Sequence, residues 1–191
     1  MAESARAAPR LGAEDWLRAG LDVMVDEGIA GVKIQSLCHR LGVTKGSFYW
    51  HFADLDAFRG ELARRWAEDG ARLHGGFDHQ TDPAGSLLHA MEIFADQRNR
   101  NLTRAMRDWA QHDPRARDAV RSADQVLFEQ LRDAIVRLGF DEADAEVRAK
   151  ILYYAGVGFA HVGSLGTRSS AQQQLAATWA LLTQRSPTPA I

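Results

Sequence analysis

Residues 29–52, IAGVKIQSLCHRLGVTKGSFYWHF, decide the fold class of this 191-residue chain. The first part of the stretch repeats apolar residues at i, i+3, i+4 and i+7, which predicts a short amphipathic helix. Its inner face would carry Ile34, Leu37, Cys38 and Leu41. Gly42 follows, and glycine readily takes the positive φ that ends a helix. Thr44 is then a candidate cap, through its hydroxyl, for a second helix. The stretch therefore predicts two short helices joined by a tight turn.

The second helix has a small core and a large polar and aromatic surface. Phe48 and Phe52 are four residues apart and should face inward, whereas Lys45 and Tyr49 share another face. A helix of about two turns with so many exposed donors indicates a recognition helix that lies in the major groove of DNA. The alternative is an ordinary aromatic surface left by a short helix.

The run GVTKGSFYWHF at residues 42–52, preceded by Leu37-Cys38, resembles the helix-turn-helix of the TetR family of transcriptional regulators. The resemblance implies an all-α fold, with an N-terminal three-helix helix-turn-helix DNA-binding domain and a C-terminal helical ligand-binding and dimerisation domain. Two residues depart from the family pattern. Lys33 stands where the family usually has a Ser or Thr cap, and Leu55 stands where a Lys is common.

The resemblance also implies which side chains contact an operator. Lys45 can donate to guanine O6 or N7, Tyr49 can reach a phosphate or a thymine methyl, and Gln35 suits adenine. Trp50 either packs beside the DNA backbone or is partly buried against the first helix. The expected DNA-binding residues are Lys33, Gln35, Thr44, Lys45, Gly46, Ser47, Tyr49, Trp50 and His51. Arg6 and Arg10 either reach the minor groove or belong to a tail without a role.

Helical periodicity continues through the rest of the chain. We expect the DNA-binding domain to span 1–53, a connecting fourth helix 54–73, and the ligand-binding and dimerisation domain 74–191. The first helix should run from about Ala13 to Glu27, and the segment 74–86, rich in Gly, Asp and Pro, is the clearest linker. Asp113-Pro114 marks the start of a long helix that ends near Leu138.

The last two helices indicate an interface between two chains. Apolar residues surround most of the segment from Val147 to Leu165, and several Ala and Gly residues would permit close approach of another helix. The resemblance implies a four-helix interface in a homodimer. The expected interface residues are Val147, Ile151, Ala155, Gly158, Phe159, Val162, Leu175, Trp179 and Leu182. The alternative is that both helices form core within one chain.

In the TetR family a small molecule bound in the C-terminal domain usually releases the DNA. The candidate pocket residues here are Trp66, Met91, Phe94, Met106, Trp109, Phe128 and Tyr154, although Met and aromatic side chains at helical spacing also form ordinary core. The resulting hypothesis is a repressor that a small-molecule effector releases from a near-palindromic operator. The alternative is an activator, or a DNA-organising or protein-interaction module without an inducer.

Composition limits the other classes of function. The net charge of −2 gives no bulk attraction to DNA, but residues 28–53 contain no Asp or Glu and two Lys, one Arg and two His. One cysteine excludes an intramolecular disulfide. The N-terminus lacks the apolar segment of a signal peptide, and the apolar run 151–165 is shorter than a membrane span, so we expect a cytoplasmic protein. No catalytic, cofactor or metal-binding motif is present, so we expect no enzyme, no cofactor and no metal site.

Overall fold

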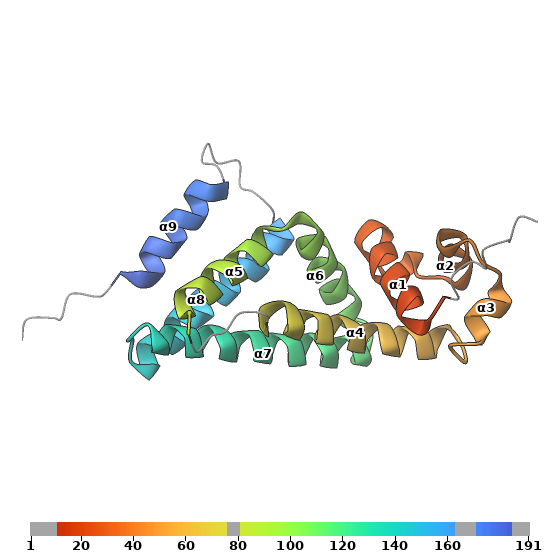
Figure 1. The fold of residues 1–191 in the computed structure, drawn as a ribbon, viewed down its shortest axis with the longest axis horizontal. Helices are drawn as coiled ribbons and strands as arrows, with labels where there is room; N and C mark the ends of the chain where they lie inside the picture. Colours follow the sequence, from red (N-terminus) through yellow and green to blue (C-terminus); the bar gives the residue numbers. More distant parts are fainter. Residues whose placement is uncertain (1–10, 76–80, 163–170, 185–191) are drawn as a thin grey trace, which may run out of the picture.

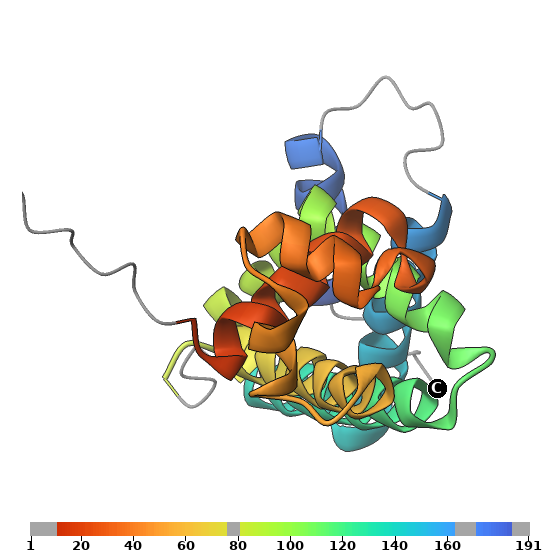
Figure 2. The same cartoon turned by 90° about the vertical axis from the view of Figure 1, so that its right-hand side faces the viewer.

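The computed structural model describes residues 11–75, 81–162 and 171–184, and every regular element in these ranges is helical. Figure 1 shows an elongated molecule with a compact head at one end, and Figure 2 views it from the head. The helices are α1 (Ala13–Glu27), η1 (Ile29–Gly31), α2 (Ile34–Leu41), α3 (Lys45–Tyr49), α4 (Leu55–Gly75), α5 (Pro83–Ala95), α6 (Gln97–Ala110), α7 (Pro114–Arg137), α8 (Glu142–Val162) and α9 (Ala171–Thr183). The all-α architecture predicted from the sequence is confirmed. Arg6 and Arg10 lie outside the described residues.

The head consists of α1, α2 and α3 around a cluster of aromatic rings. Phe48 is fully buried, and its ring centroid lies 5.3 Å from that of Trp16, 5.3 Å from that of Phe52 and 5.6 Å from that of Phe58. An isolated helix of five residues is not stable in water, so tertiary packing must hold α3. Phe48 supplies that packing, because it is the side chain of α3 that is buried in the core.

Two local predictions for α3 were wrong. The helix ends at Tyr49 and is shorter than the expected two turns, because Phe52 reaches the core from the turn that follows. Thr44 occupies the N-cap position with extended φ and ψ angles, but its hydroxyl caps nothing. The predicted end of α2 is confirmed, since Gly42 has a φ of 68°.

Helix α4 connects the head to the rest of the molecule. Asp54 starts it as predicted, since its side chain accepts a hydrogen bond from the backbone nitrogen of Ala57 at 2.7 Å. Phe58 and Leu62 are fully buried against α1 at Gly20, where a Cβ atom would lie 2.8 Å from Phe58 and 2.9 Å from Leu62. Beyond this contact α4 runs beside α7 (Figure 1).

Two clusters of buried side chains divide the molecule. The first joins α1–α4 to α6 and the start of α7, through residues such as Met106, Trp109 and Ala116. The second joins α5, α8 and α9 to the later part of α7, through residues such as Leu131 and Ile135. Helix α7 therefore contributes to both clusters, and its first half packs against the same core as the head.

The boundaries of the later helices mostly follow the sequence signals. Asp113 caps α7 through a hydrogen bond from the backbone nitrogen of Arg115, with Pro114 in the first turn, and Gly139 after α7 has a φ of 91°. The predicted linker 74–86 was too long. Helix α4 extends to Gly75, and Asp82 caps α5, which already begins at Pro83.

One buried arginine fastens the end of α9 to α8. Arg148 is 8% exposed, and it donates to the carbonyl oxygens of Leu182 at 2.7 Å and Gln184 at 3.0 Å. Its Nε donates to Asp144, and its guanidinium lies 4.2 Å from the ring centroid of Phe140. The cation thus satisfies carbonyl groups at the C-terminus of α9, where helix carbonyls lack partners. No pattern in the sequence predicted this contact.

Candidate functional site

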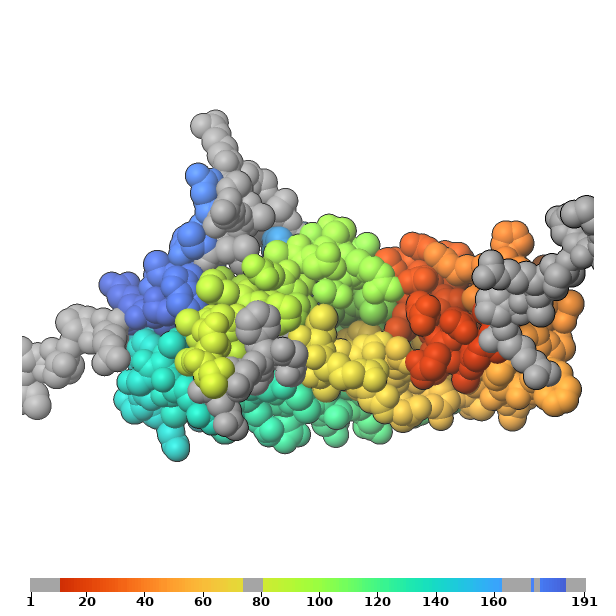
Figure 3. All heavy atoms as spheres, in the orientation of Figure 1, coloured from red at the N-terminus to blue at the C-terminus, as the bar shows by residue number. Residues whose placement is uncertain are grey.

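The first candidate site is the outer surface of α2 and α3, at the far end of the head. In Figure 3 this surface lies in the orange region, at the opposite end of the molecule from the blue α9. The predicted DNA-binding residues lie close together in sequence and are exposed, except for Ser47, which is half-buried: Lys33, Gln35, Thr44, Lys45, Gly46, Tyr49, Trp50 and His51. The fold therefore places these groups on an accessible surface.

The two lysines and the two rings on this surface are available for a partner. Lys33 and Lys45 form no ion pair with the described part of the chain, whereas Arg40 is already paired with Asp26 of α1 at 3.0 Å. Trp50 is 88% exposed and Tyr49 is 56% exposed. The alternative that Trp50 is buried against α1 was therefore wrong.

The thiol of Cys38, which is buried beneath this surface, is unreactive. Burial raises the pKa of Cys38, although the positive charge of Lys45 partly opposes this effect. A thiol with a raised pKa stays protonated near neutral pH, and the thiolate is the reactive form. Cys38 therefore serves as a small core residue of α2, as its place on the apolar stripe predicted.

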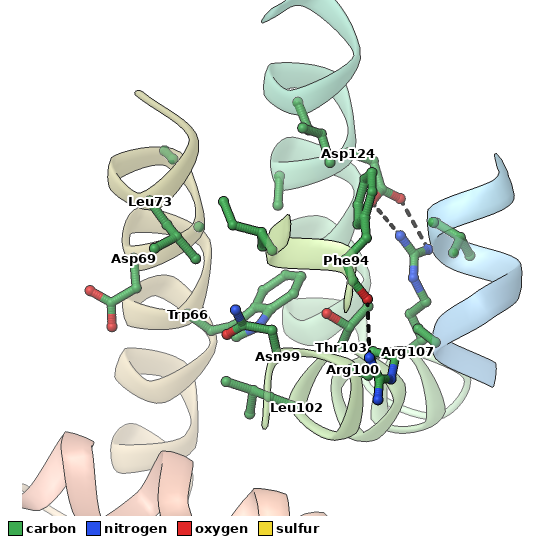
Figure 4. A pocket seen from close by; sticks show the side chains of 18 of the residues that line it. Trp66, Asp69, Leu73, Phe94, Asn99, Arg100, Leu102, Thr103, Arg107 and Asp124 are labelled. Carbon is green, nitrogen blue, oxygen red and sulfur yellow. Dashed lines mark hydrogen bonds and ion pairs between the residues drawn. The ribbon is translucent and has the colours of Figure 1, made fainter. Parts of the chain in front are cut away.

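The second candidate site is a partly open cavity of about 520 Å³, lined by α4, α5, α6, α7 and α8 and by Leu21 of α1. Its wall is mainly apolar, with Trp66, Phe94, Leu102 and Leu127 among the lining side chains. Figure 4 shows Trp66 on α4 facing the space that Phe94, Asn99 and Thr103 border from the other side. Cavities of this size and character are typical of sites for small organic molecules.

A polar network closes one side of the cavity. Arg107 on α6 donates to both carboxylate oxygens of Asp124 on α7, at 2.5 and 3.1 Å, and to the hydroxyl of Tyr153 on α8 at 3.1 Å. The Nε atom of Arg107 is buried and has no hydrogen-bond partner. Three helices thus contribute one residue each to a network whose ion pair is neutral overall.

The environment fixes the protonation states of this network. Burial raises the pKa of Tyr153 to about 12, and a hydrogen bond with Asp124 adds to the effect, so the phenol remains protonated. Burial lowers the pKa of Arg107, but the hydrogen bond with Asp124 and its negative charge outweigh that effect, so the pKa of Arg107 is raised. The network therefore offers a neutral hydroxyl and a permanently paired guanidinium to a ligand.

The sequence located only part of this cavity. Of the predicted pocket residues, Trp66 and Phe94 line it. Met91, Met106 and Trp109 are at most 5% exposed and belong to the two cores, and Phe128 packs against the second core. The prediction that Tyr154 lines the pocket was wrong, because Tyr154 is 64% exposed on the outside of α8. Its neighbour Tyr153 faces the cavity instead. Neighbouring residues of a helix point about 100° apart, and the apolar pattern of α8 did not determine which side of the helix faces the cavity.

The third candidate site is an exposed apolar stripe along α8. Val147, Ile151, Tyr154 and Val162 are 56–64% exposed, and their spacing places them on one side of the helix. Ala155 and Gly158 are exposed beside them, and a Cβ atom added at Gly158 would meet no other atom within 4 Å. Large exposed apolar surfaces of this kind mark contacts with another protein. Gly156, by contrast, is approached from within the chain, since a Cβ atom there would lie 2.7 Å from the ring of Phe94.

Other predicted interface residues face elsewhere. Phe159 is half-buried beneath Arg100, Trp179 packs against the second core, and Leu182 is 5% exposed in that core. The side chain of Leu175 lies outside the described residues. Leu181 of α9 is 71% exposed, and it was not among the predicted interface residues.

Comparison with known proteins identifies the head. Residues 17–62 match a family described as bacterial regulatory proteins of the tetR family. This part of the chain resembles the helix-turn-helix domain of the tetR family. The match spans α1 to the first part of α4, including the exposed surface of α2 and α3, so the DNA-binding helix-turn-helix read from the sequence is confirmed.

Several solved structures share this fold along nearly the whole chain. A transcriptional regulator from Rhodococcus sp. Rha1 superposes with a TM-score of 0.74 at 22% identity, covering 90% of this chain and 96% of that one. A putative regulator from Saccharomonospora viridis, solved in complex with choline, gives 0.68 at 18% identity, covering 87% and 92%. A putative TetR-family regulator from Rhodococcus sp. gives 0.61 at 16% identity, covering 90% and 98%. A search of curated proteins gives no match.

Within residues 11–75, 81–162 and 171–184, no three His, Cys, Asp or Glu side chains gather in a way that could hold a metal ion. Among the same residues, no helix combines the length and apolar character that crossing a bilayer requires.

Proposed function

We propose that this protein is a TetR-family regulator, a homodimeric repressor that binds a near-palindromic operator and leaves it when a small molecule enters the cavity. The observation that carries the proposal is the accessible surface of α2 and α3. Lys45 and Tyr49 project from a helix that a single buried phenylalanine fixes to the core, and neither lysine of the surface is neutralised by a carboxylate of the described residues.

In this proposal α3 enters the major groove and α2 supports it. Lys45 donates to guanine and Gln35 to adenine, whereas Thr44, Ser47 and His51 bind phosphate groups. Gly46 permits close approach of the backbone, because it adds no side chain to the exposed side of α3. The two-fold axis of a dimer then requires two half-sites about one turn of DNA, or a multiple of one, apart.

The apolar stripe of α8 supports the dimer. Two α8 helices can pack closely where Ala155 and Gly158 leave the helix surface thin, with Ile151 and Val162 on either side. Leu181 of α9 extends the apolar surface. Burying these side chains between two chains removes them from water, which stabilises the association.

Release by a small molecule follows from the position of the cavity between the head and α8. Trp66 lines the cavity and belongs to α4, the helix that begins directly after the recognition surface. A ligand that prefers one position of α4 shifts the population of dimers away from the spacing that fits DNA. The division into a DNA-binding region 1–53, a connecting α4 and a C-terminal effector and dimer region agrees with this proposal.

The test is selection of bound fragments from random genomic DNA with purified protein, followed by footprinting. The proposal expects a near-palindromic sequence protected by two protomers. Binding without sequence preference and with a steep dependence on salt would instead indicate a DNA-organising protein.

A further inference from the structure

The charged groups around the cavity are unevenly paired. Four arginines and two aspartates line it. Three of the arginines form ion pairs: Arg72 with Asp69 at 2.6 Å, Arg98 with Asp22 at 2.5 Å, and Arg107 with Asp124 at 2.5 Å. The fourth, Arg100, pairs with no carboxylate among the described residues. The cavity wall therefore carries one positive charge that no acidic side chain of the described ranges neutralises.

The contacts of Arg100 are all neutral. Its guanidinium donates to the carbonyl oxygens of Phe94 and Ala95 and to the side-chain oxygen of Gln97, and it lies 4.8 Å from the ring centroid of Phe159. The two carbonyl groups belong to the last turn of α5, whose dipole favours a cation but carries only a fraction of a charge. Half-buried between these groups, the cation of Arg100 would gain from an anion in the cavity, because interactions of charges strengthen away from bulk water.

The rest of the wall suits an uncharged organic body. Trp66 and Phe94 face the space from different helices (Figure 4), and the ring of Phe94 lies close against Gly156. At the other side, the Arg107–Asp124 pair is neutral and Tyr153 is protonated, so this side offers hydrogen bonds without net charge. Among the described residues that line the cavity, Arg100 is therefore the one charged group that no opposite charge balances.

We infer that the cavity takes an amphipathic organic anion, with an acidic headgroup at Arg100 and an apolar body between Trp66 and Phe94. The inference rests on the proposed function for its regulatory meaning, but the site itself is independent of DNA. A carboxylate is the simplest headgroup of this class, because its two oxygens match the two-pronged donor set of a guanidinium.

The experiment compares three probes that share one body and differ in the headgroup: phenylbutyrate, phenylbutanol and phenylbutylamine. Calorimetric titration of the DNA-free protein measures each affinity. We expect the acid to bind at least about tenfold more tightly than the alcohol, the factor that a charge-assisted hydrogen bond typically contributes, and the amine to bind most weakly.

Two arginine variants assign the preference to one side chain. Arg100→Gln should remove the preference for the acid while keeping the affinity for the alcohol. Arg104→Gln is the matched control, because Arg104 lies one turn further along α6, is exposed and bonds to Asn101 outside the cavity. It should keep the preference. Gly156→Ala should weaken all three probes, since the new Cβ atom would overlap the ring of Phe94 and displace it from its position in the cavity wall. Circular dichroism checks that each variant is folded.

The inference is overturned if the alcohol binds as tightly as the acid, if no probe binds, or if Arg100→Gln keeps the preference. Loss of the preference in Arg104→Gln would also overturn it, because a general effect of surface charge would then suffice. Operator binding measured without any probe tests the proposed function separately, so that the two failures are distinguishable.

Discussion

Arg115 joins the connecting helix to the start of α7, and its removal should destabilise the protein in a pH-dependent way. Its guanidinium donates to both oxygens of Asp56 in the first turn of α4, at 2.7 and 2.8 Å, and to both oxygens of Asp113 at 3.1 and 2.9 Å. The hydrogen bond from the Arg115 side chain is the largest cause that lowers the pKa of Asp113 from 3.8 to about 2. Asp56 is shifted in the same direction, also mainly by Arg115.

The magnitude follows from the pKa of Asp113. At about 1.36 kcal/mol per pH unit, the lowering corresponds to roughly 2.4 kcal/mol of stability. The side chain of Arg115 is 38% exposed, so solvent screening reduces the expected loss in Arg115→Gln to about 1–2 kcal/mol. The folded-state pKa of Asp113 is depressed, so this contribution is complete above its unfolded value of 3.8 and is lost as the pH falls toward about 2.

The assay is urea unfolding followed by circular dichroism, at equal protomer concentrations because a dimer's stability depends on concentration. Arg115→Gln should unfold more easily than the wild type at neutral pH, and the difference should shrink between about pH 4 and pH 2. Asp113→Asn should show a similar loss of stability. Its amide oxygen can still cap α7, so this variant removes the charge and keeps the cap. Arg132→Gln, which removes an exposed pair with Asp133, is the control and should leave the free energy of unfolding unchanged. Equal stability of wild type and Arg115→Gln at neutral pH, or a difference that does not vary with pH, would refute this reasoning.

Two further predictions concern packing and assembly. Gly20→Ala should destabilise the protein by about 1–3 kcal/mol in thermal or urea unfolding, because the new Cβ atom would overlap Phe58 of α4. Gly70→Ala, where a Cβ atom meets nothing within 4 Å, should be neutral or stabilising, and a neutral Gly20→Ala would contradict the observed closeness of α1 and α4. Ile151→Lys should shift the protein from dimer to monomer in sedimentation velocity at micromolar concentration, because it places a charge in the apolar stripe of α8. Leu88→Lys changes an exposed apolar residue of α5 outside that stripe and should leave the dimer intact, and a dimeric Ile151→Lys variant would count against the α8 interface.

The head was the most predictable part of the molecule. The apolar stripe of α2, the glycine after it and the inward Phe48 are local signals, and each appears in the structure as read. The length of α3 was not predictable. Phe52 lies four residues after Phe48, as on the same face of a helix, although α3 already ends at Tyr49. The packing of Trp16 on Phe48 was missed for a different reason, since it joins residues 32 positions apart and no periodicity reports such a contact.

The cavity was harder to predict from the sequence, because its polar residues come from separate helices. Arg107, Asp124 and Tyr153 are unremarkable in sequence, and only the packing of α6, α7 and α8 makes them neighbours. The phase of α8 was the other difficulty. Its apolar residues cover both sides of the helix, so the sequence indicated an interface and a core at once, and could not assign Tyr153 and Tyr154 to their sides.

The central claim is that the exposed side of α3 reads DNA. Its most direct test is a gel-shift titration of wild type, Lys45→Ala and Tyr49→Ala on the selected operator at one fixed salt concentration. Arg132→Ala, at the far end of α7 from the head, is the control. We predict that each of the two α3 variants stays folded and dimeric but loses about 1–3 kcal/mol of operator affinity for each half-site that it contacts, while the control binds like the wild type. Operator affinities equal to the wild type for both Lys45→Ala and Tyr49→Ala would contradict the account.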